Sequence, residues 1–301
     1  GNVDNYESYI NMPALDYYTQ TNKNGKWVVR ENAVPALKAF EDEWIDVAWY
    51  FDTENYNQGG KSFDISTKEE LYGLSAISQT YTFAGDTINL TSDITMNSGK
   101  ATDWAAGKNT GDARLWKSIG MPKGYEFKGM FNGNNHTISG IYCNKVGGHT
   151  GFVGQLVGGT VNNLQLSNSY FSRGGNNVGG LAAYMKGGKV NSVYCDVIVN
   201  QTSATSKNVG GLIGRADDTV SVTNSWFAGT VTSKGRYTGG IVGFVNGTAN
   251  ITDCLVTGKV QGNYTDLEAT MYVGGILGGD EKGNWTLTRC FMAGEMSVVD
   301  S

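Results

Sequence analysis

The stretch Val209-Gly-Gly-Leu-Ile-Gly214, continued by Val222-Thr-Asn-Ser-Trp-Phe-Ala-Gly-Thr-Val231, decides the fold because the chain repeats it. The first half occurs in five copies, and each copy holds one shared glycine: Gly151, Gly180, Gly211, Gly240 and Gly275. Successive shared glycines lie 29, 31, 29 and 35 residues apart. A recurring unit of about 30 residues is the sequence signature of a solenoid or another repeat architecture.

The second half of each unit has the pattern of short β-strands. Ten to twelve residues after the shared glycine comes an apolar anchor, in turn Val161, Val190, Val222, Ile251 and Leu287. A polar pair follows each anchor, and then a stretch in which apolar and polar residues alternate, which is typical of strands. A unit this small cannot bury a core alone, but stacked units can. We therefore predict an all-β solenoid, a right-handed parallel β-helix, over residues 111–301.

Aligning the five units predicts the direction of the side chains that follow each anchor. Two columns should point into the core: Leu164, Val193, Ser225, Cys254 and Cys290, and, two residues further on, Leu166, Cys195, Phe227, Val256 and Met292. The column between them should point outward, because side chains alternate along a strand. This outward column holds Gln165, Tyr194, Trp226, Leu255 and Phe291. The alternatives are that a loop or the N-terminal segment covers this face, or that the alignment is shifted by one residue.

Residues 49–110 are predicted to form a small helical cap on the N-terminal end of the β-helix. A cap is needed there because an open end would expose unpaired strand edges. Thr67-Lys-Glu-Glu70 matches the capping-box pattern, so we expect a helix at 67–78, followed by a strand at 87–95. Residues 1–48 should be an extension with one helix at 35–48, where Leu37, Phe40, Trp44 and Val47 lie on one stripe.

Composition and charge disfavour several classes of protein. The 301 residues include 43 glycines and only 3 prolines, which fits neither collagen nor a disordered linker. A net charge of −5 without a basic run argues against a nucleic-acid partner. No stretch approaches the ~20 apolar residues of a membrane span, so we expect no direct membrane insertion by this segment. The four cysteines lie too far apart for a zinc site or a dense disulfide framework, and stacking of Cys254 on Cys290 suits a disulfide poorly.

Proteins with this fold often degrade polysaccharides, so the acidic residues need scrutiny. A hydrolase needs two or three carboxylates converging on one wall. The candidates are Asp196, Asp217, Asp218, Asp253, Asp280 and Glu281. In the alignment Asp253 stacks between Asn224 and Arg289, so no acidic ladder forms, and the two acidic pairs are expected in solvated turns. We therefore expect no catalytic residues, no metal site and no cofactor, and a chain that is not an enzyme.

The ordered set of segments resembles the GLUG-motif repeat proteins. The lead-in is carried by Phe63-Asp-Ile-Ser-Thr-Lys-Glu-Glu-Leu71, Phe83-Ala-Gly-Asp-Thr-Ile-Asn-Leu-Thr-Ser-Asp-Ile94, Trp116-Lys-Ser-Ile-Gly120 and Phe127-Lys-Gly-Met-Phe-Asn-Gly-Asn-Asn-His-Thr-Ile138. The glycine-rich units that follow resemble the GLUG repeats themselves, so the resemblance covers about residues 49–301. It implies a secreted or surface-anchored β-helix protein of Bacteroides-type bacteria, similar to adhesins. The repeat also accompanies some surface peptidases without being their catalytic part.

The leading functional hypothesis is a non-catalytic surface module for adhesion or for binding a glycan or a protein. Its expected ligand-binding residues are Tyr194, Trp226, Leu255 and Phe291. The expected partner is a host or dietary glycan or a surface protein, and the chain itself is expected to be a monomer. We expect an extracellular or cell-surface location at the outer membrane; a lipid anchor carried by a removed signal segment is one way of attachment. The alternatives are a polysaccharide-degrading hydrolase or lyase and a passive structural spacer.

Overall fold

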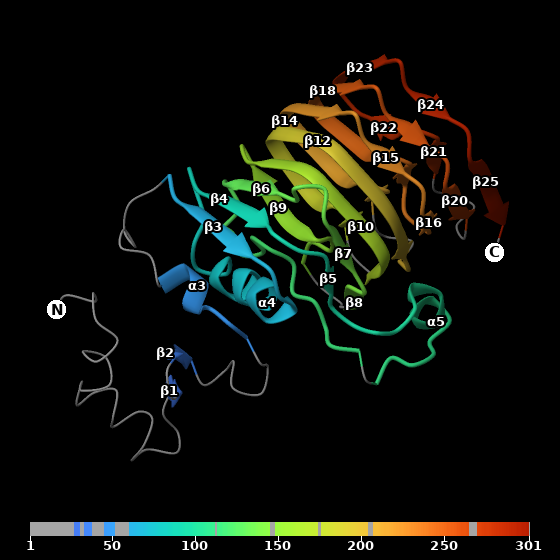
Figure 1. Ribbon diagram of the computed structural model, residues 1–301. Coiled ribbons are helices and arrows are strands. Elements are labelled where there is room, and N and C mark those ends of the chain that lie inside the picture. Colours follow the sequence, from blue (N-terminus) through green and yellow to red (C-terminus); the bar gives the residue numbers. More distant parts are fainter. Residues whose placement is uncertain are drawn as a thin grey trace.

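The chain folds as a parallel β-helix of about seven turns, as the computed structural model shows (Figure 1). The structure describes residues 27–30, 33–37, 45–51, 60–111, 113–144, 148–173, 176–203, 207–264 and 270–300. One sheet of 19 strands winds around the core, and a four-stranded sheet closes it along one side. From residue 113 onward, the described residues contain no helix. The predicted fold class is therefore confirmed.

The last three coils consist of four, four and five strands. The four-stranded sheet contributes the first strand of a coil: β11 (Asn177–Gly179), β13 (Asn208–Gly210), β17 (Tyr237–Gly239) or β21 (Tyr272–Gly274). The coil that begins with β13 continues through β14 (Ile213–Thr223), β15 (Trp226–Phe227) and β16 (Thr230–Ser233). The next continues through β18 (Val242–Thr252), β19 (Leu255–Val256) and β20 (Lys259–Tyr264), and the last through β22 (Leu277–Asp280), β23 (Asn284–Thr288), β24 (Phe291–Met292) and β25 (Glu295–Asp300).

In the earlier coils the chain follows the same course, but the strands are longer or shorter. They comprise β3 (Ser62–Ile65), β4 (Thr87–Leu90), β5 (Ile94–Thr95), β6 (Met130–Asn132), β7 (Thr137–Ser139), β8 (Tyr142–Asn144), β9 (Val153–Val157), β10 (Thr160–Arg173) and β12 (Ala182–Gln201). All inter-coil pairings among them are parallel, with Phe63 beside Ile88 and Ile88 beside Phe131, and the β10–β12 pairing has one register shift, between Ser167 and Ser169. The stack thus reaches back to residue 62, into the region predicted as a cap.

The anchor residues stack in one column, as predicted, and only Leu287 of the last coil is exposed. Val161 pairs with Val190, Val190 with Val222, Val222 with Ile251, and Ile251 with Leu287. The first four anchors have no exposed surface. Both predicted inward columns also lie in the core, with Cys290 and Met292 of the last coil partly exposed. Side chains alternate along a strand, so the position between the two inward columns faces outward in every coil.

The repeated Gly-Gly pair marks a close approach between coils. A side-chain carbon on Gly211 would lie 2.1 Å from the carbonyl oxygen of Gly240, and one on Gly240 would lie 2.1 Å from that of Gly275. No larger residue fits at such a distance. The shared glycines from Gly180 to Gly275 are not among the residues with positive φ, so crowding, rather than a left-handed backbone, requires them.

Helix α4 (Lys68–Ile77) lies at the N-terminal end of the stack (Figure 1). Thr67 accepts a hydrogen bond from the Glu70 amide and Glu70 accepts one from the Thr67 amide, which confirms the predicted capping box. Leu71 and Leu74 are fully buried in the core. The predicted strand at 87–95 is present as β4 and β5, but it is part of the stack itself.

The helix predicted at 35–48 is wrong where the structure describes it. Residues 33–37 form strand β2 (Ala33–Leu37), antiparallel to β1 (Trp27–Arg30), and helix α3 (Ala48–Phe51) begins only at the last predicted position. Residues 38–44 and 1–26 lie outside the described residues. Pro35 falls at a register shift between the paired residues of β1 and β2, where a residue without an amide hydrogen is tolerated.

Helix α5 (Ala101–Ala105) covers the outer face of the first complete coils. Trp104 lies 5.2 Å from Tyr142 between ring centroids, and Tyr142 stacks on Tyr170 at 6.1 Å. All three side chains are buried. This face is therefore occupied by the chain's own α5, whereas the outward column lies earlier in each coil, as Gln165 precedes Tyr170 within β10.

Candidate functional site

The predicted outward column lies where the alignment placed it. Gln165 pairs with Tyr194, Tyr194 with Trp226, Trp226 with Leu255, and Leu255 with Phe291. Trp226 is 41% exposed and Phe291 66% exposed, whereas Tyr194 and Leu255 are half-buried. No described loop or helix buries these side chains. We call Gln165, Tyr194, Trp226, Leu255 and Phe291 the outward strip.

The two central rings of the outward strip contact each other edge to face. The centroids of Tyr194 and Trp226 are 4.9 Å apart, with an angle of 71° between the planes. The Trp226 indole donates a hydrogen bond of 2.7 Å to the Thr257 hydroxyl in the next coil, which fixes the ring. Burial, assisted by the nearby Asp196 carboxylate, raises the pKa of the Tyr194 phenol, so the phenol remains a neutral hydrogen-bond donor.

A second column of polar residues runs beside the outward strip, at the corner between the anchor strand and the strip. Its members have left-handed backbones with φ between 49° and 54°: Asn163, Ser192, Asn224, Asp253 and Arg289. A tight corner requires such a conformation, and Asn and Asp adopt it more readily than other side chains. In the first three of these coils the corner residue is neutral, and in the last two it is charged.

The amide side chains at this corner are held in place by hydrogen bonds between coils. The Asn224 amide donates to the Asn191 carbonyl oxygen over 2.9 Å, and Asn163 donates to Asn132 over 3.3 Å. The Gln165 amide donates to the main-chain carbonyl of Asn135 over 3.1 Å. Each of these amides still has a second N–H and a carbonyl oxygen that bind no described residue.

An open hollow of about 430 Å³ lies between the corner column and the outward strip. We call it the amide hollow. Its lining consists of amide, hydroxyl and aromatic side chains with one buried valine: Asn135, Asn163, Gln165, Ser192, Val193, Tyr194, Asn224 and Trp226. No charged side chain lines it. The sequence predicted the rings and Gln165 but not the asparagines beside them, because the corner conformation that places the asparagines there has no separate signal in the alignment.

A cluster of charged and aromatic side chains on another strand of the coils was not predicted. Tyr184, Arg215 and Phe244 occupy equivalent positions on β12, β14 and β18. The Tyr184 hydroxyl donates to Asp217 over 3.0 Å, and Arg215 donates two hydrogen bonds to the same carboxylate over 2.8 and 3.1 Å. Burial and the neighbouring Asp217 raise the pKa of Tyr184 to about 12. His149 stacks on Tyr184 at 5.7 Å.

The Asp217 interaction corrects the expectation that both acidic pairs are solvated turn charges. Asp217 and Asp218 lie within strand β14, and the Asp217 side chain is only 16% exposed. Asp253 accepts two hydrogen bonds from Arg289, which confirms that it stacks on that residue. Further carboxylate contacts join Asp218 to Lys186, Glu281 to Arg236 and Asp280 to the Trp285 indole. Among the described residues, no three His, Cys, Asp or Glu side chains are placed to hold a metal ion.

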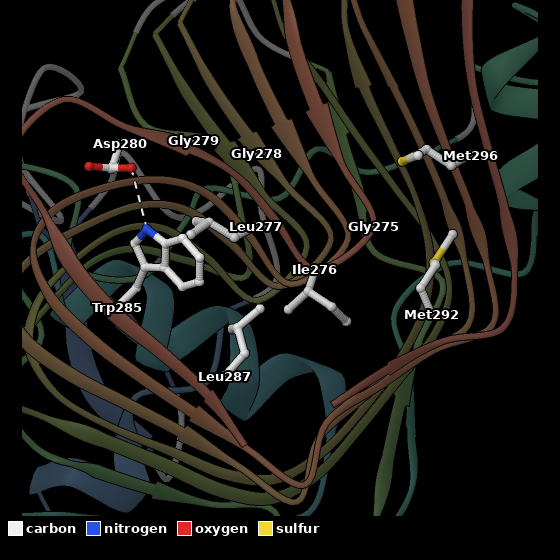
Figure 2. Close-up of a pocket in the computed structure, with 10 residues that line it drawn as sticks. All are labelled: Gly275, Ile276, Leu277, Gly278, Gly279, Asp280, Trp285, Leu287, Met292 and Met296. Atoms are coloured by element: carbon white, nitrogen blue, oxygen red, sulfur yellow. Dashed lines mark hydrogen bonds between the residues drawn. The ribbon is translucent and has the colours of Figure 1, made fainter. Parts of the chain in front are cut away.

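A second hollow, of about 480 Å³, lies at the last coil. Figure 2 shows Ile276, Leu287 and Met292 pointing into the interior of the β-helix there. Trp285 and Leu287 continue columns whose preceding members, Ala249 and Ile251, have no exposed surface. The lining of this hollow therefore continues the columns of the hydrophobic core.

Comparison with known proteins supports the fold and leaves the family open. No family model matches the chain, so the resemblance to GLUG-motif proteins remains a prediction. A stretch of 164 residues, 54% of the chain, is 27% identical to halomucin of Haloquadratum walsbyi, but it spans only 2% of halomucin's length. The fold matches a Bacteroides ovatus structure described as a "putative immunoglobulin A1 protease" with a TM-score of 0.59. That match has 16% identity and covers 81% of this chain and 80% of the other.

The Bacteroides ovatus structure contradicts the expectation that this chain is not an enzyme. The expectation was argued mainly from the absence of an acidic ladder, which bears on polysaccharide hydrolysis and not on peptide cleavage. At 16% identity the match shows the fold alone. No helix in the described part of the chain is both long and apolar enough to cross a membrane.

Proposed function

We propose that this chain is a cell-surface module that binds glycans through the outward strip and the adjoining amide hollow. The observation that carries the proposal is that the half-exposed Trp226 and Tyr194 rings lie beside side-chain amides. These amides are held by hydrogen bonds within the protein but keep further donors and acceptors for a ligand. Sugars present apolar ring faces and hydroxyl edges, so a site that binds them combines aromatic rings with paired donors and acceptors. The similarity to halomucin is in keeping with a surface location.

A screen of the purified chain against an immobilised glycan array tests the proposal. We expect at least one glycan class to bind, and Trp226→Ala to lower that binding by about tenfold, since a stacked ring contributes roughly 0.5–1.5 kcal/mol beyond its buried area. Trp285→Ala is the matched control, because Trp285 is 49% exposed but lies outside the strip. If no glycan binds, or if both variants lose binding equally, the proposal is wrong, and a spacer or protein-docking role gains support.

A peptidase activity is the second candidate, and the description of the Bacteroides ovatus structure is the observation that favours it. The place to examine first is the cluster in which His149, Tyr184 and Asp217 lie together. Incubation of the chain with immunoglobulin A1, followed by electrophoresis, tests this candidate directly. Cleavage that is lost in Asp217→Asn would assign the activity to this cluster, whereas intact immunoglobulin would remove the candidate for this substrate.

A further inference from the structure

The side chains that line the amide hollow favour a narrower class of ligand than glycans in general. We infer that it takes an uncharged, hydroxyl-rich chain of sugar rings, two to three rings long, lying parallel to the axis of the β-helix. This inference rests on the proposed function and names the ligand class of the same site.

The first argument is the distribution of charge. The lining of the amide hollow contains no Lys, Arg, His, Asp or Glu side chain. Along the axis it is flanked by His136, which contacts Asp93, on one side and by the Arg289–Asp253 ion pair on the other, and the Asp196 carboxylate lies near Tyr194. An acidic sugar would therefore lose hydration without gaining a counter-charge, and that loss is unfavourable. A neutral sugar loses only hydroxyl hydration, which the amides replace.

The second argument is the state of the polar groups. The amides of Asn163, Gln165 and Asn224 each use one N–H within the protein. Since an amide has two N–H donors and one carbonyl acceptor, each keeps a donor and an acceptor side by side. Neighbouring hydroxyls on a pyranose ring present the complementary pair. Because these side chains are already fixed, binding costs little additional side-chain entropy.

The third argument excludes an extended peptide as the occupant. The backbone at Gln165, Tyr194 and Trp226 is paired with strands on both sides, through Thr137, Leu255 and the pairings within the outward strip. No strand edge is left there for a peptide to join, and edge pairing supplies most of the affinity when sheets bind peptides. The amide hollow therefore offers side-chain contacts only, which suits sugar rings.

The size of the hollow gives the length and the direction of the ligand. Its lining advances by one coil from Gln165 to Tyr194 and by one more from Tyr194 to Trp226. Two coil spacings amount to about 10 Å along the axis, because paired strands lie about 4.8 Å apart. An extended chain of pyranose rings has a similar repeat per ring, so one ring falls at each coil.

Calorimetric titration with cellohexaose, xylohexaose and mannohexaose as neutral probes, and with hexagalacturonate as an acidic probe, tests the inference. We expect a neutral probe to bind with an affinity that changes by less than about twofold between low and high salt, because no ion pair forms. Asn224→Asp should lower this affinity by about tenfold, since it replaces the free N–H with a second acceptor and adds a charge.

Asp253→Asn is the matched control. Asp253 has the same left-handed backbone one coil further on, with φ of 54° against 50° at Asn224, so the corner accepts either residue. We expect this control to leave binding unchanged. Asn224→Asp also loses the hydrogen bond to Asn191, so its melting temperature should fall slightly while the chain stays folded. If only hexagalacturonate binds, the ligand class is wrong. If a neutral probe binds and Asn224→Asp has no effect, the location is wrong. In both cases the proposed function, glycan binding through the outward strip, remains valid. If no glycan on the array binds, the proposed function itself is wrong.

Discussion

The opposite directions of Trp226 and Phe227 give a direct test of the register on which the site depends. These neighbours form the two-residue strand β15, yet Trp226 is 41% exposed and Phe227 has no exposed surface. Truncating each to alanine should therefore have very different consequences for folding, and removal of the smaller, buried ring should cost more than removal of the larger, exposed one.

The expected magnitudes follow from the contacts of each ring. Trp226→Ala removes the edge-to-face contact with Tyr194 and the hydrogen bond to Thr257, each of which contributes about 0.5–1.5 kcal/mol, so the free energy of unfolding should fall by about 1–2 kcal/mol. Phe227→Ala leaves a cavity between Cys195 and Val256 of the neighbouring coils, and the expected loss is about 3–5 kcal/mol.

Urea unfolding followed by circular dichroism measures both losses. Repeat proteins can unfold in parts, so the comparison is valid only if both variants keep the wild-type dependence on urea concentration. A loss for Trp226→Ala equal to or larger than that for Phe227→Ala would show that Trp226 points inward. The outward strip would then not exist, and the glycan proposal would lose its physical basis.

The close contacts between coils and the buried titratable groups can be tested at three further residues. Gly211→Ala should lower the free energy of unfolding by about 3 kcal/mol or more, because the new methyl group would meet the backbone of the next coil. Gly111→Ala is the control: the space around Gly111 is open, so urea unfolding should show no change. The pKa of Tyr184 is raised to about 12, so its neutral phenol stabilises the fold below pH 10, and this stabilisation is lost as the pH rises towards 12. Asp217→Asn should lower the pKa of this phenol, which an ultraviolet titration measures. Cys254 should resist a thiol reagent in the native state and react after unfolding, because burial raises its pKa to about 12.

The sequence predicted the parts of the fold that repeat. One anchor position per unit was enough to establish the register, because a shift of one residue would have turned every buried side chain to solvent. The phase of the outward strip followed from the anchors alone, which is why Tyr194 and Trp226 lie where predicted.

The parts that were missed depend on interactions between coils. The left-handed corner at Asn163 and Asn224 resembles any polar position in the sequence, and only stacking shows that it aligns amides beside the rings. The Tyr184 cluster lies just after the Gly-Gly pair, where Tyr184, Arg215 and Phe244 share a position but no residue type. The helix expected at 35–48 failed because a hydrophobic stripe alone does not exclude a strand around Pro35.

The change of chemistry along the axis sets the limit of the site. The corner residue is Asn or Ser in the coils of Gln165, Tyr194 and Trp226, and it becomes Asp253 and then Arg289 in the two coils that follow. Since these two charged residues bind each other, the next positions of the strip, Leu255 and Phe291, have no free amide beside them. The rings of a sugar chain that extends past Trp226 would therefore find no amide to bind their hydroxyl groups. They would contact only the apolar side chains of Leu255 and Phe291, beside the Asp253–Arg289 ion pair. For this reason recognition of hydroxyl groups should end at the third coil, and the more exposed Phe291 should contribute to binding only if a ligand or a partner offers an apolar surface there.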